Sequence, residues 1–214
     1  MIDPAELRRE YARAGLRRSE MDPDPFREFA KWFDAAVASG NAEPNAMTLS
    51  TTNIDGFPSS RTVLLKVFDA RGFCFFTNYG SRKARELAEN PRASLTFFWY
   101  NLERQVSIAG SVERTSSEES AKYFHSRPRG SQLGALVSTQ SEIIPNRAFL
   151  EQRLAELEAQ YAGFNEIPLP DFWGGFRLKP VRFEFWQGRP NRLHDRFQYV
   201  LTDAGSWQMD RLSP

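Results

Sequence analysis

The sequence AMTLSTTNIDGFPSSRTVLLKVFDARGFCFFTN, residues 46–78, decides the fold. It holds three runs rich in apolar and β-forming residues, at 46–53, 60–68 and 72–78. Turn-forming residues separate the runs, including Asp55-Gly56 between the first two, and this pattern is typical of antiparallel strands joined by short turns. The stretch therefore predicts a β-meander.

Further strands and helices are expected around this meander. The other expected strands are 92–100, 104–113, 173–178, 181–187, 193–201 and 206–212. The expected helices are 4–40, 81–90, a segment from Ser116 or Ser117 to Pro128, 131–138 and 146–161. Many antiparallel strands with helices at the ends and between hairpins predict an α+β fold centred on a β-barrel, and disfavour a parallel dinucleotide-binding sheet.

The composition is close to that of average soluble proteins. Of the 214 residues, 41% are hydrophobic and 26% are charged, which excludes a disordered or collagen-like chain. The formal net charge of +1 gives no overall field that would attract nucleic acid or an anionic membrane. No apolar stretch reaches the roughly 20 residues that span a bilayer, and the first residues form no apolar leader, so a cytoplasmic location is expected.

Several kinds of chemistry lack the residues they need. One cysteine, Cys74, and two histidines, His125 and His194, are too few for a zinc or other transition-metal centre, so no metal is expected. The glycine-rich phosphate loops G-x-G-x-x-G and G-x-x-x-x-G-K-[ST] are absent, as is the nucleophile motif G-x-S-x-G. Any bound phosphate must therefore be held mainly by side chains.

Two basic runs lie in the first half of the chain. Ser81, Arg82 and Lys83 open an expected helix, where cations oppose the helix dipole unless an anion compensates them. This arrangement suggests a phosphate site, although a solvated basic turn would have the same sequence. Arg61 and Lys66 interrupt an apolar strand and, five residues apart, should point to opposite faces and serve different partners, unless they only protect a sheet edge.

Two more polar clusters lie in the second half. Tyr123, His125, Arg127, Arg129 and Ser131 surround a helix end and offer enough donors for a second phosphate, although cations are common at helix C-termini. In the run 192–196, alternation along a strand would place the two arginines and the histidine on one face. Such a face of like charges favours an anionic or electron-rich ligand.

Several long motifs lie in these regions. They are RTVLLK at 61–66, FFTNYGSRKA at 75–84, LERQV at 102–106, KYFHSRPRGSQLGALVSTQS at 122–141, FWGGFR at 172–177 and FWQGRPNRLHDRF at 185–197. Together these motifs resemble the pyridoxine/pyridoxamine 5'-phosphate oxidase family. The resemblance runs from RREY at 8–11 to MDRL at 209–212. It implies a homodimeric, FMN-binding split β-barrel with two flavins at the subunit interface, which oxidises the phosphorylated vitamin to pyridoxal 5'-phosphate with O2 as acceptor.

The resemblance also assigns roles to residues. For the cofactor FMN it implies Arg61, Thr62, Val63, Leu64, Leu65, Lys66, Phe76, Thr77, Arg82, Lys83, Gln105, Gln140, Ser141, Trp186 and Arg196, with Gln140 and Ser141 supplied by the partner subunit. For the substrate it implies Arg8, Arg9, Glu10, Tyr11, Lys66, Tyr123, Arg127, Ser131, Arg192 and His194, the last two being catalytic.

The resemblance leaves the proton transfer open. Hydride transfer from the C4' carbon to the flavin is the cofactor's chemistry, so the protein must mainly align two rings. Arg196 is expected at the pyrimidine edge of the flavin, with Arg192 and His194 at the reacting carbon. The proton could go to His194, to Arg192 or to the substrate's own phenolic oxygen.

The chain is expected to form one domain. A helical arm is expected at 1–41, the FMN-binding core at 42–141, and strands that complete the active site and dimer interface at 171–214.

Two other functions fit many of the same sequence features. The nearest rival is a related flavin oxidase acting on another planar substrate, as in phenazine pathways. A non-catalytic split-barrel module that binds flavin, haem or pyridoxal phosphate is the rival of a different class, and a nucleic-acid binder is disfavoured by the balanced charge.

Overall fold

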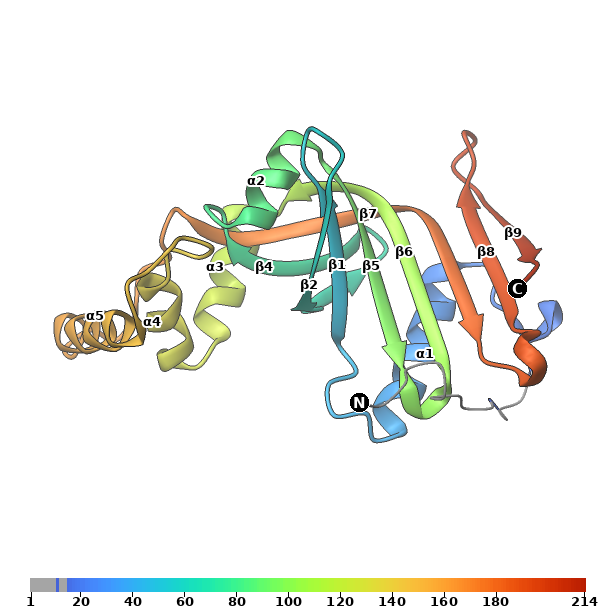
Figure 1. Ribbon diagram of the computed structural model, residues 1–214, viewed down its shortest axis with the longest axis horizontal. Coiled ribbons are helices and arrows are strands. Elements are labelled where there is room, and N and C mark those ends of the chain that lie inside the picture. The colour runs from blue at the N-terminus through green and yellow to red at the C-terminus, as the bar shows by residue number, and fades with distance from the viewer. Residues whose placement is uncertain (1–10, 12–14) are drawn as a thin grey trace, which may run out of the picture.

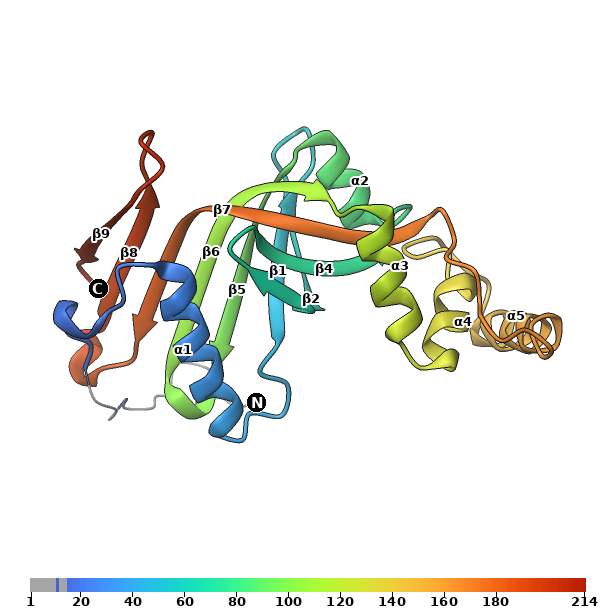
Figure 2. The same ribbon diagram turned by 180° about the vertical axis from the view of Figure 1, so that it is seen from behind.

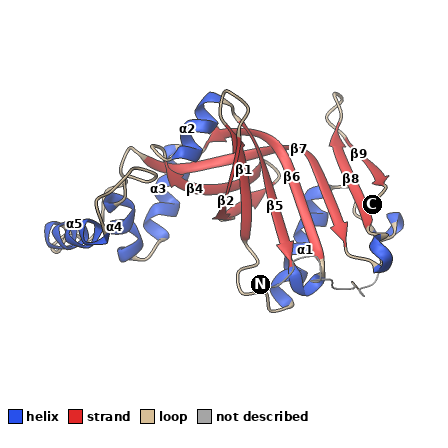
Figure 3. Ribbon diagram, in the orientation of Figure 1, coloured by secondary structure: helices blue, strands red, loops and turns tan. Residues whose placement is uncertain are grey.

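The structure is a computed structural model that describes Tyr11 and residues 15–214. Its strands are β1 (Ala46–Thr52), β2 (Pro58–Leu64), β3 (Val67–Asp69), β4 (Gly72–Asn78), β5 (Arg92–Trp99), β6 (Arg104–Arg114), β7 (Trp173–Gln187), β8 (Asp195–Leu201) and β9 (Trp207–Leu212). Its α-helices are α1 (Pro25–Ala38), α2 (Arg82–Glu89), α3 (Ser117–Ser126), α4 (Arg129–Val137) and α5 (Arg147–Gln160). In this part of the chain the expected antiparallel α+β architecture is confirmed (Figure 3).

The nine strands form one antiparallel sheet that curls on itself. The order is β2-β1-β5-β6-β7-β4-β3, and the β8–β9 hairpin is attached through pairing of β8 with β7. The first half of β7 pairs with β4 and its second half with β8, while β6 lies along its other edge. The long strand β7 therefore joins the curled core to the C-terminal hairpin, with α3–α5 at the opposite end of the molecule (Figures 1 and 2).

Strand β7 is continuous where two strands were expected. The sequence predicted a break between 178 and 181, but the structure has a β-bulge there, with Gly110 opposite Pro180 and Ala109 opposite Arg182. A bulge tolerates proline because the ladder is already interrupted. Gly110 is required at this point, since a Cβ atom there would lie 1.9 Å from the carbonyl oxygen of Lys179.

The expected strand 60–68 is divided into β2 and β3. The backbone N–H of Leu65 donates to the carbonyl of Asn45 at 2.8 Å, whereas that of Lys66 donates to Cys74 at 2.9 Å. The chain thus leaves its partner β1 and joins β4 between two successive residues. This corner closes the curled sheet, and the prediction of one continuous strand was wrong because local propensity does not report a change of partner.

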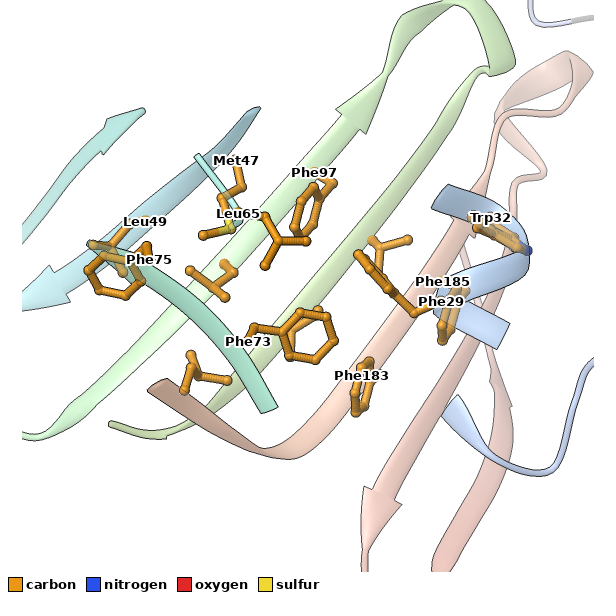
Figure 4. Packing of buried hydrophobic residues seen from close by; sticks show 14 of the residues in the cluster. Phe29, Trp32, Met47, Leu49, Leu65, Phe73, Phe75, Phe97, Phe183 and Phe185 are labelled. Carbon is orange, nitrogen blue, oxygen red and sulfur yellow. The ribbon is translucent and has the colours of Figure 1, made fainter. Parts of the chain in front are cut away.

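Phenylalanine side chains fill the core between the sheet and α1 (Figure 4). Phe29 of α1 is completely buried, with its ring centroid 4.9 Å from that of Phe73 and 5.1 Å from that of Phe97. Edge-to-face contacts of this kind are the favoured geometry for aromatic pairs. Thirteen of the 29 aromatic residues are buried, and eleven of these belong to this core.

The N-terminal helix is shorter than expected. Of the predicted helix 4–40, residues 1–10 and 12–14 lie outside the described part of the chain, and α1 begins only at Pro25. Asp24 caps it by accepting a hydrogen bond from the N–H of Phe26 at 2.9 Å. No helix in the described residues is long and apolar enough to cross a membrane.

Candidate active site

A cavity of about 1040 Å³ lies between the curled sheet and helices α2–α4. Its lining consists of Ser59, Ser60, Arg61, Thr62, Val63, Leu64, Lys66, Phe76, Thr77, Asn78, Arg82, Lys83, Tyr123, Arg127, Pro128, Ser131, Gly134, Ala135, Ser138, Gln140, Ser141 and Trp173. Five of these side chains are cations, and among the described lining residues there is no carboxylate. The cavity is therefore suited to anionic ligands.

The first cationic pocket consists of Arg61, Arg82 and Lys83, and a buried carboxylate orients its two arginines. Glu86 of α2 accepts a hydrogen bond from Arg61 Nη2 at 3.2 Å and one from Arg82 Nε at 2.8 Å. Burial would raise the pKa of Glu86, but hydrogen bonds, first those from Ser59 and Thr51 and then those from the arginines, lower it to about 2. Glu86 is therefore ionised at neutral pH and holds both guanidinium groups in place.

Lys83, the third cation of the first cationic pocket, is half-buried among neutral oxygen atoms. Its Nζ donates to Gln140 Oε1 at 2.9 Å and to Thr77 Oγ1 at 3.1 Å. Burial, followed by the charge of Arg61, lowers the pKa of Lys83 to about 8. A bound anion would stabilise the charged form of this amine.

The start of α2 differs in one detail from expectation. Ser81 is the N-cap residue, but its hydroxyl accepts no hydrogen bond from the helix amides and lies 3.4 Å from Lys83 Nζ. The N–H of Arg82 donates instead to Ser141 Oγ at 3.1 Å. Gln140 and Ser141 were expected from the partner subunit, yet the chain's own copies lie here, because the loop after α4 folds back over the start of α2.

The second cationic pocket consists of Lys66, Tyr123, Arg127 and Ser131. Nη1 of Arg127 is buried without a hydrogen-bond partner among the described residues, and burial lowers the pKa of this guanidinium. A buried donor left unpaired is unfavourable unless a ligand completes it. The expectation that Arg61 and Lys66 face apart was wrong, since the break after β2 turns both into the same cavity.

An aromatic wall runs beside the second cationic pocket. The rings of Phe76 and Tyr123 stack with centroids 4.1 Å apart, and Trp173 continues the stack 6.1 Å from Tyr123. The guanidinium carbon of Arg127 lies 4.8 Å from the centroid of Trp173. Cation–π contact thus fixes the arginine against the wall while leaving its N–H groups available to a ligand.

A third group, the C-terminal cluster, comprises Gln105, Trp186, Arg192, His194 and Arg196. The sheet register aligns Gln105 of β6 with Trp186 of β7, and Trp186 with Arg196 of β8, so three side chains form a row on one face. Arg196 donates from Nε to Glu184 at 2.9 Å, and that carboxylate raises the pKa of the arginine. The row combines a flat indole with fixed hydrogen-bond donors.

Arg192 and His194 lie beside this row but not on the strand. Arg192 belongs to the 3-10 helix Pro190–Arg192 and has φ 60°, while β8 begins only at Asp195. The expected alternation of 192, 194 and 196 on one strand face was therefore wrong. His194 nevertheless lies next to the row through a tertiary contact, with its ring centroid 4.7 Å from that of Trp186.

The C-terminal cluster and the cavity are far apart within one chain. No residue of the cluster lines the cavity, in the part of the chain that the structure describes. Trp173 at the cavity is the first residue of β7 and Trp186 in the cluster is the last but one, so roughly 40 Å of strand separates them at about 3.3 Å per residue. Figure 1 shows β7 running from the side of helices α3–α5 toward the β8–β9 hairpin. These two separate groups within one chain are the two halves of the candidate site.

Comparison with known protein families identifies the family of the chain. The family model described as Pyridoxamine 5'-phosphate oxidase matches residues 33–161. The chain belongs to the pyridoxamine 5'-phosphate oxidase family. A second model, described as the Pyridoxine 5'-phosphate oxidase C-terminal dimerisation region, matches residues 173–214, which include most of the C-terminal cluster.

Individual relatives of this family are similar over their whole length. The pyridoxine/pyridoxamine 5'-phosphate oxidase of Rubrobacter xylanophilus is 58% identical over 99% of this chain and 97% of its own. That of Crocosphaera subtropica is 55% identical, with both chains covered completely. The structure of PhzG from Burkholderia lata, in complex with tetrahydrophenazine-1-carboxylic acid, has a TM-score of 0.86 at 31% identity over 92% of this chain and 95% of that one. The predicted split β-barrel is confirmed.

The remaining predicted site residues do not line the cavity or lie outside the described part of the chain. Of the run 61–66, Leu65 alone packs into the core and does not line the cavity. Arg8, Arg9 and Glu10 lie outside the described residues. Tyr11 is described, with its ring centroid 5.5 Å from Trp186, so it lies against the C-terminal cluster.

Some residues of the candidate site were not predicted. Two others were expected near the second phosphate but do not line the cavity. Glu86 was missed, although its position four residues after Arg82 on a helix is a signal for an ion pair. Trp173 was missed because an aromatic residue at the start of a strand is expected to pack in the hydrophobic core. His125 and Arg129 belong to the cluster around the helix end but point elsewhere, bonding to the carbonyls of Ile167 and Phe164.

Proposed function

We propose that the protein oxidises pyridoxine 5'-phosphate and pyridoxamine 5'-phosphate to pyridoxal 5'-phosphate, with FMN as cofactor and O2 as the final electron acceptor, which is released as H2O2. The observation that carries this proposal is one cavity with two separate cationic pockets. Two relatives named pyridoxine/pyridoxamine 5'-phosphate oxidase are 55% and 58% identical over nearly the whole chain.

The charge of the cavity supports two phosphate esters. Its five cations, offset by the carboxylate of Glu86, leave four positive charges. A phosphate monoester carries up to two negative charges at neutral pH, so two such esters balance the site. A single phosphate would leave the other pocket uncompensated.

The first cationic pocket fits the FMN phosphate, because it joins two fixed guanidinium groups, a half-buried amine and the start of α2. The second fits the substrate phosphate, because Arg127 has a buried donor without a partner in the described part of the chain. Lys66, Tyr123 and Ser131 add donors around the same space. The aromatic wall excludes water from one side.

When bound, FMN would supply the redox chemistry, because its flavin ring can accept a hydride from the C4' carbon of the substrate. The chain's own residues hold the two rings in place. The row of Gln105, Trp186 and Arg196 offers a flat surface and donors to the flavin edge, and the charge of Arg196 would favour the reduced, anionic form. Arg192 and His194 would face the reacting carbon.

A homodimer would bring the two halves together. The match of 173–214 to a dimerisation region supports a homodimer. We infer that the C-terminal cluster of one subunit completes the cavity of its partner, which gives two equivalent sites related by the dimer axis. The separation of the halves within one chain supports this arrangement.

A phenazine-type substrate is the second candidate, because the PhzG structure is similar in fold. The second cationic pocket favours the phosphorylated substrate, since tetrahydrophenazine-1-carboxylic acid carries one carboxylate and no phosphate. Turnover can be compared directly with the two substrates. Faster turnover of the phenazine precursor would reverse the assignment.

The proposal is tested by a visible spectrum of the purified holoprotein. Anaerobic addition of pyridoxine 5'-phosphate should bleach the absorbance of bound flavin, and admitting O2 should restore it. A protein that binds no flavin, or whose flavin stays oxidised with this substrate, would refute the proposed function. The use of O2 and the cytoplasmic location both stay predictions.

A further inference from the structure

His194 receives a hydrogen bond from the main chain. The turn between β7 and β8 folds back so that the N–H of Arg189 donates to Nδ1 of His194, with 3.1 Å between the nitrogen atoms. A ring nitrogen that accepts a hydrogen bond carries no proton, so the neutral ring has its proton on Nε2. We propose that the Arg189 amide fixes His194 as the Nε2–H tautomer, which makes this histidine a hydrogen-bond donor in the reaction and not its proton acceptor.

The backbone around Arg189 is anchored on both sides. The N–H of Gly188 donates to the carbonyl of Glu103 at 2.8 Å, and that of Leu193 donates to Pro190 at 3.1 Å. Asn191 and Arg192 both have positive φ, 56° and 60°, which is uncommon for residues with a side chain. The two left-handed residues reverse the chain and return His194 to the Arg189 amide. The strained turn therefore positions the imidazole ring of His194 for this hydrogen bond.

The surroundings of the ring favour the same state. The indole of Trp186 and the phenol of Tyr11 pack against the imidazole, with centroids 4.7 and 5.8 Å away. Burial, and then the charge of Arg192, lower the pKa of His194. Protonation of Nδ1 would also break the hydrogen bond from Arg189. The neutral Nε2–H form is the resting state at neutral pH.

This inference rests on the proposed function and reduces the number of groups that could accept the proton. Oxidation of the alcohol removes a hydride from C4' and a proton from the hydroxyl group. His194 cannot take that proton, because Nε2 already holds one and Nδ1 is engaged. Arg192 cannot take it either, since a guanidinium is not deprotonated in proteins. Of the three acceptors considered, the substrate's phenolic oxygen remains. Donors from His194 and Arg192 would hold it as the anion before the transfer, and it becomes the neutral phenol when it takes the proton of the hydroxyl group.

Nitrogen NMR of the holoenzyme tests the tautomer directly. The chain has only two histidines, so labelling with [15N]histidine gives two rings, and a His125→Gln variant assigns them. On uniformly labelled protein, we expect protonated Nε2, unprotonated Nδ1, and a scalar coupling across the hydrogen bond between Nδ1 of His194 and the Arg189 amide nitrogen. A proton on Nδ1, or no such coupling, would overturn the proposal.

Two substitutions test the role in turnover. The amide nitrogen of His194→Gln can replace the Nε2–H donor but cannot act as a base, whereas His194→Ala provides neither. We expect the Gln variant to retain at least about tenfold higher kcat than the Ala variant, since only the Gln variant keeps the donor, and a hydrogen bond to a charged group contributes about a factor of ten or more. Equal kcat values for the two variants would refute the donor role. Failure of the unsubstituted holoenzyme to oxidise the substrate would instead refute the proposed function, while the NMR result would still decide the tautomer.

Discussion

Replacing Arg127 with methionine should separate substrate binding from stability. The lost guanidinium removes a charge-assisted hydrogen bond to the substrate phosphate, worth about 1.5–3 kcal/mol. At about 1.4 kcal/mol per factor of ten, KM for pyridoxine 5'-phosphate should rise roughly 10- to 150-fold. The value of kcat should change little, because the phosphate is remote from the reacting carbon.

The same substitution should not destabilise the protein. Nη1 of Arg127 is buried without a partner among the described residues, and such a donor costs about 1–3 kcal/mol. Removing it offsets the lost cation–π contact with Trp173, worth about 0.5–1 kcal/mol. The free energy of unfolding, measured with urea, should therefore stay within about 1 kcal/mol of the parent value or rise.

Arg129→Met is the matched control for this prediction. Arg129 lies two residues away, but its guanidinium bonds to the carbonyls of Tyr161 and Phe164 outside the cavity. KM should be unchanged in this variant. The reasoning would be refuted if Arg127→Met left KM within twofold of the parent, or if both substitutions raised it equally.

Three further predictions concern the framework. Because the pKa of Glu86 lies near 2, below its ordinary 4.5, its contribution to stability is present above about pH 4.5 and is lost as the pH falls toward 2. Urea unfolding should then show the parent losing on the order of 3 kcal/mol more than Glu86→Gln over that range, and parallel losses would contradict this. Gly110→Ala should cost at least about 2 kcal/mol in the free energy of unfolding, because its Cβ would overlap the carbonyl of Lys179. Cys74 is 1% exposed, and burial raises its pKa to about 11, so alkylation at pH 8 should require denaturant; rapid labelling of the native protein would show the thiol to be accessible.

Sequence patterns predicted the elements of this fold well, because strand composition and turn residues are local signals. They failed where the cause is not local. The change of partner at Leu65 depends on Asn45 and Cys74, which are distant in sequence. The continuous strand β7 depends on a bulge opposite Gly110, which no pattern within residues 173–187 reveals.

The candidate site shows the same division. Motifs identified the cationic residues, but their arrangement depends on tertiary contacts. Arg61 and Lys66 share one cavity only because the strand between them breaks. Arg192 departs from strand alternation because of its positive φ, and His194 returns through a main-chain hydrogen bond. The sequence carries the chemistry of these side chains, whereas the fold decides which of them meet.

Mixed dimers test most directly whether the site is shared between subunits. One chain would carry Arg127→Met and the other Arg192→Ala with His194→Ala. Each variant alone, as a homodimer, should have little activity at limiting substrate. Random reassociation should restore about a quarter of the parent activity, because half of the dimers are mixed and each then has one intact site. If the mixture stayed as inactive as its components, the C-terminal cluster would not complete the partner's cavity, and the account would fail.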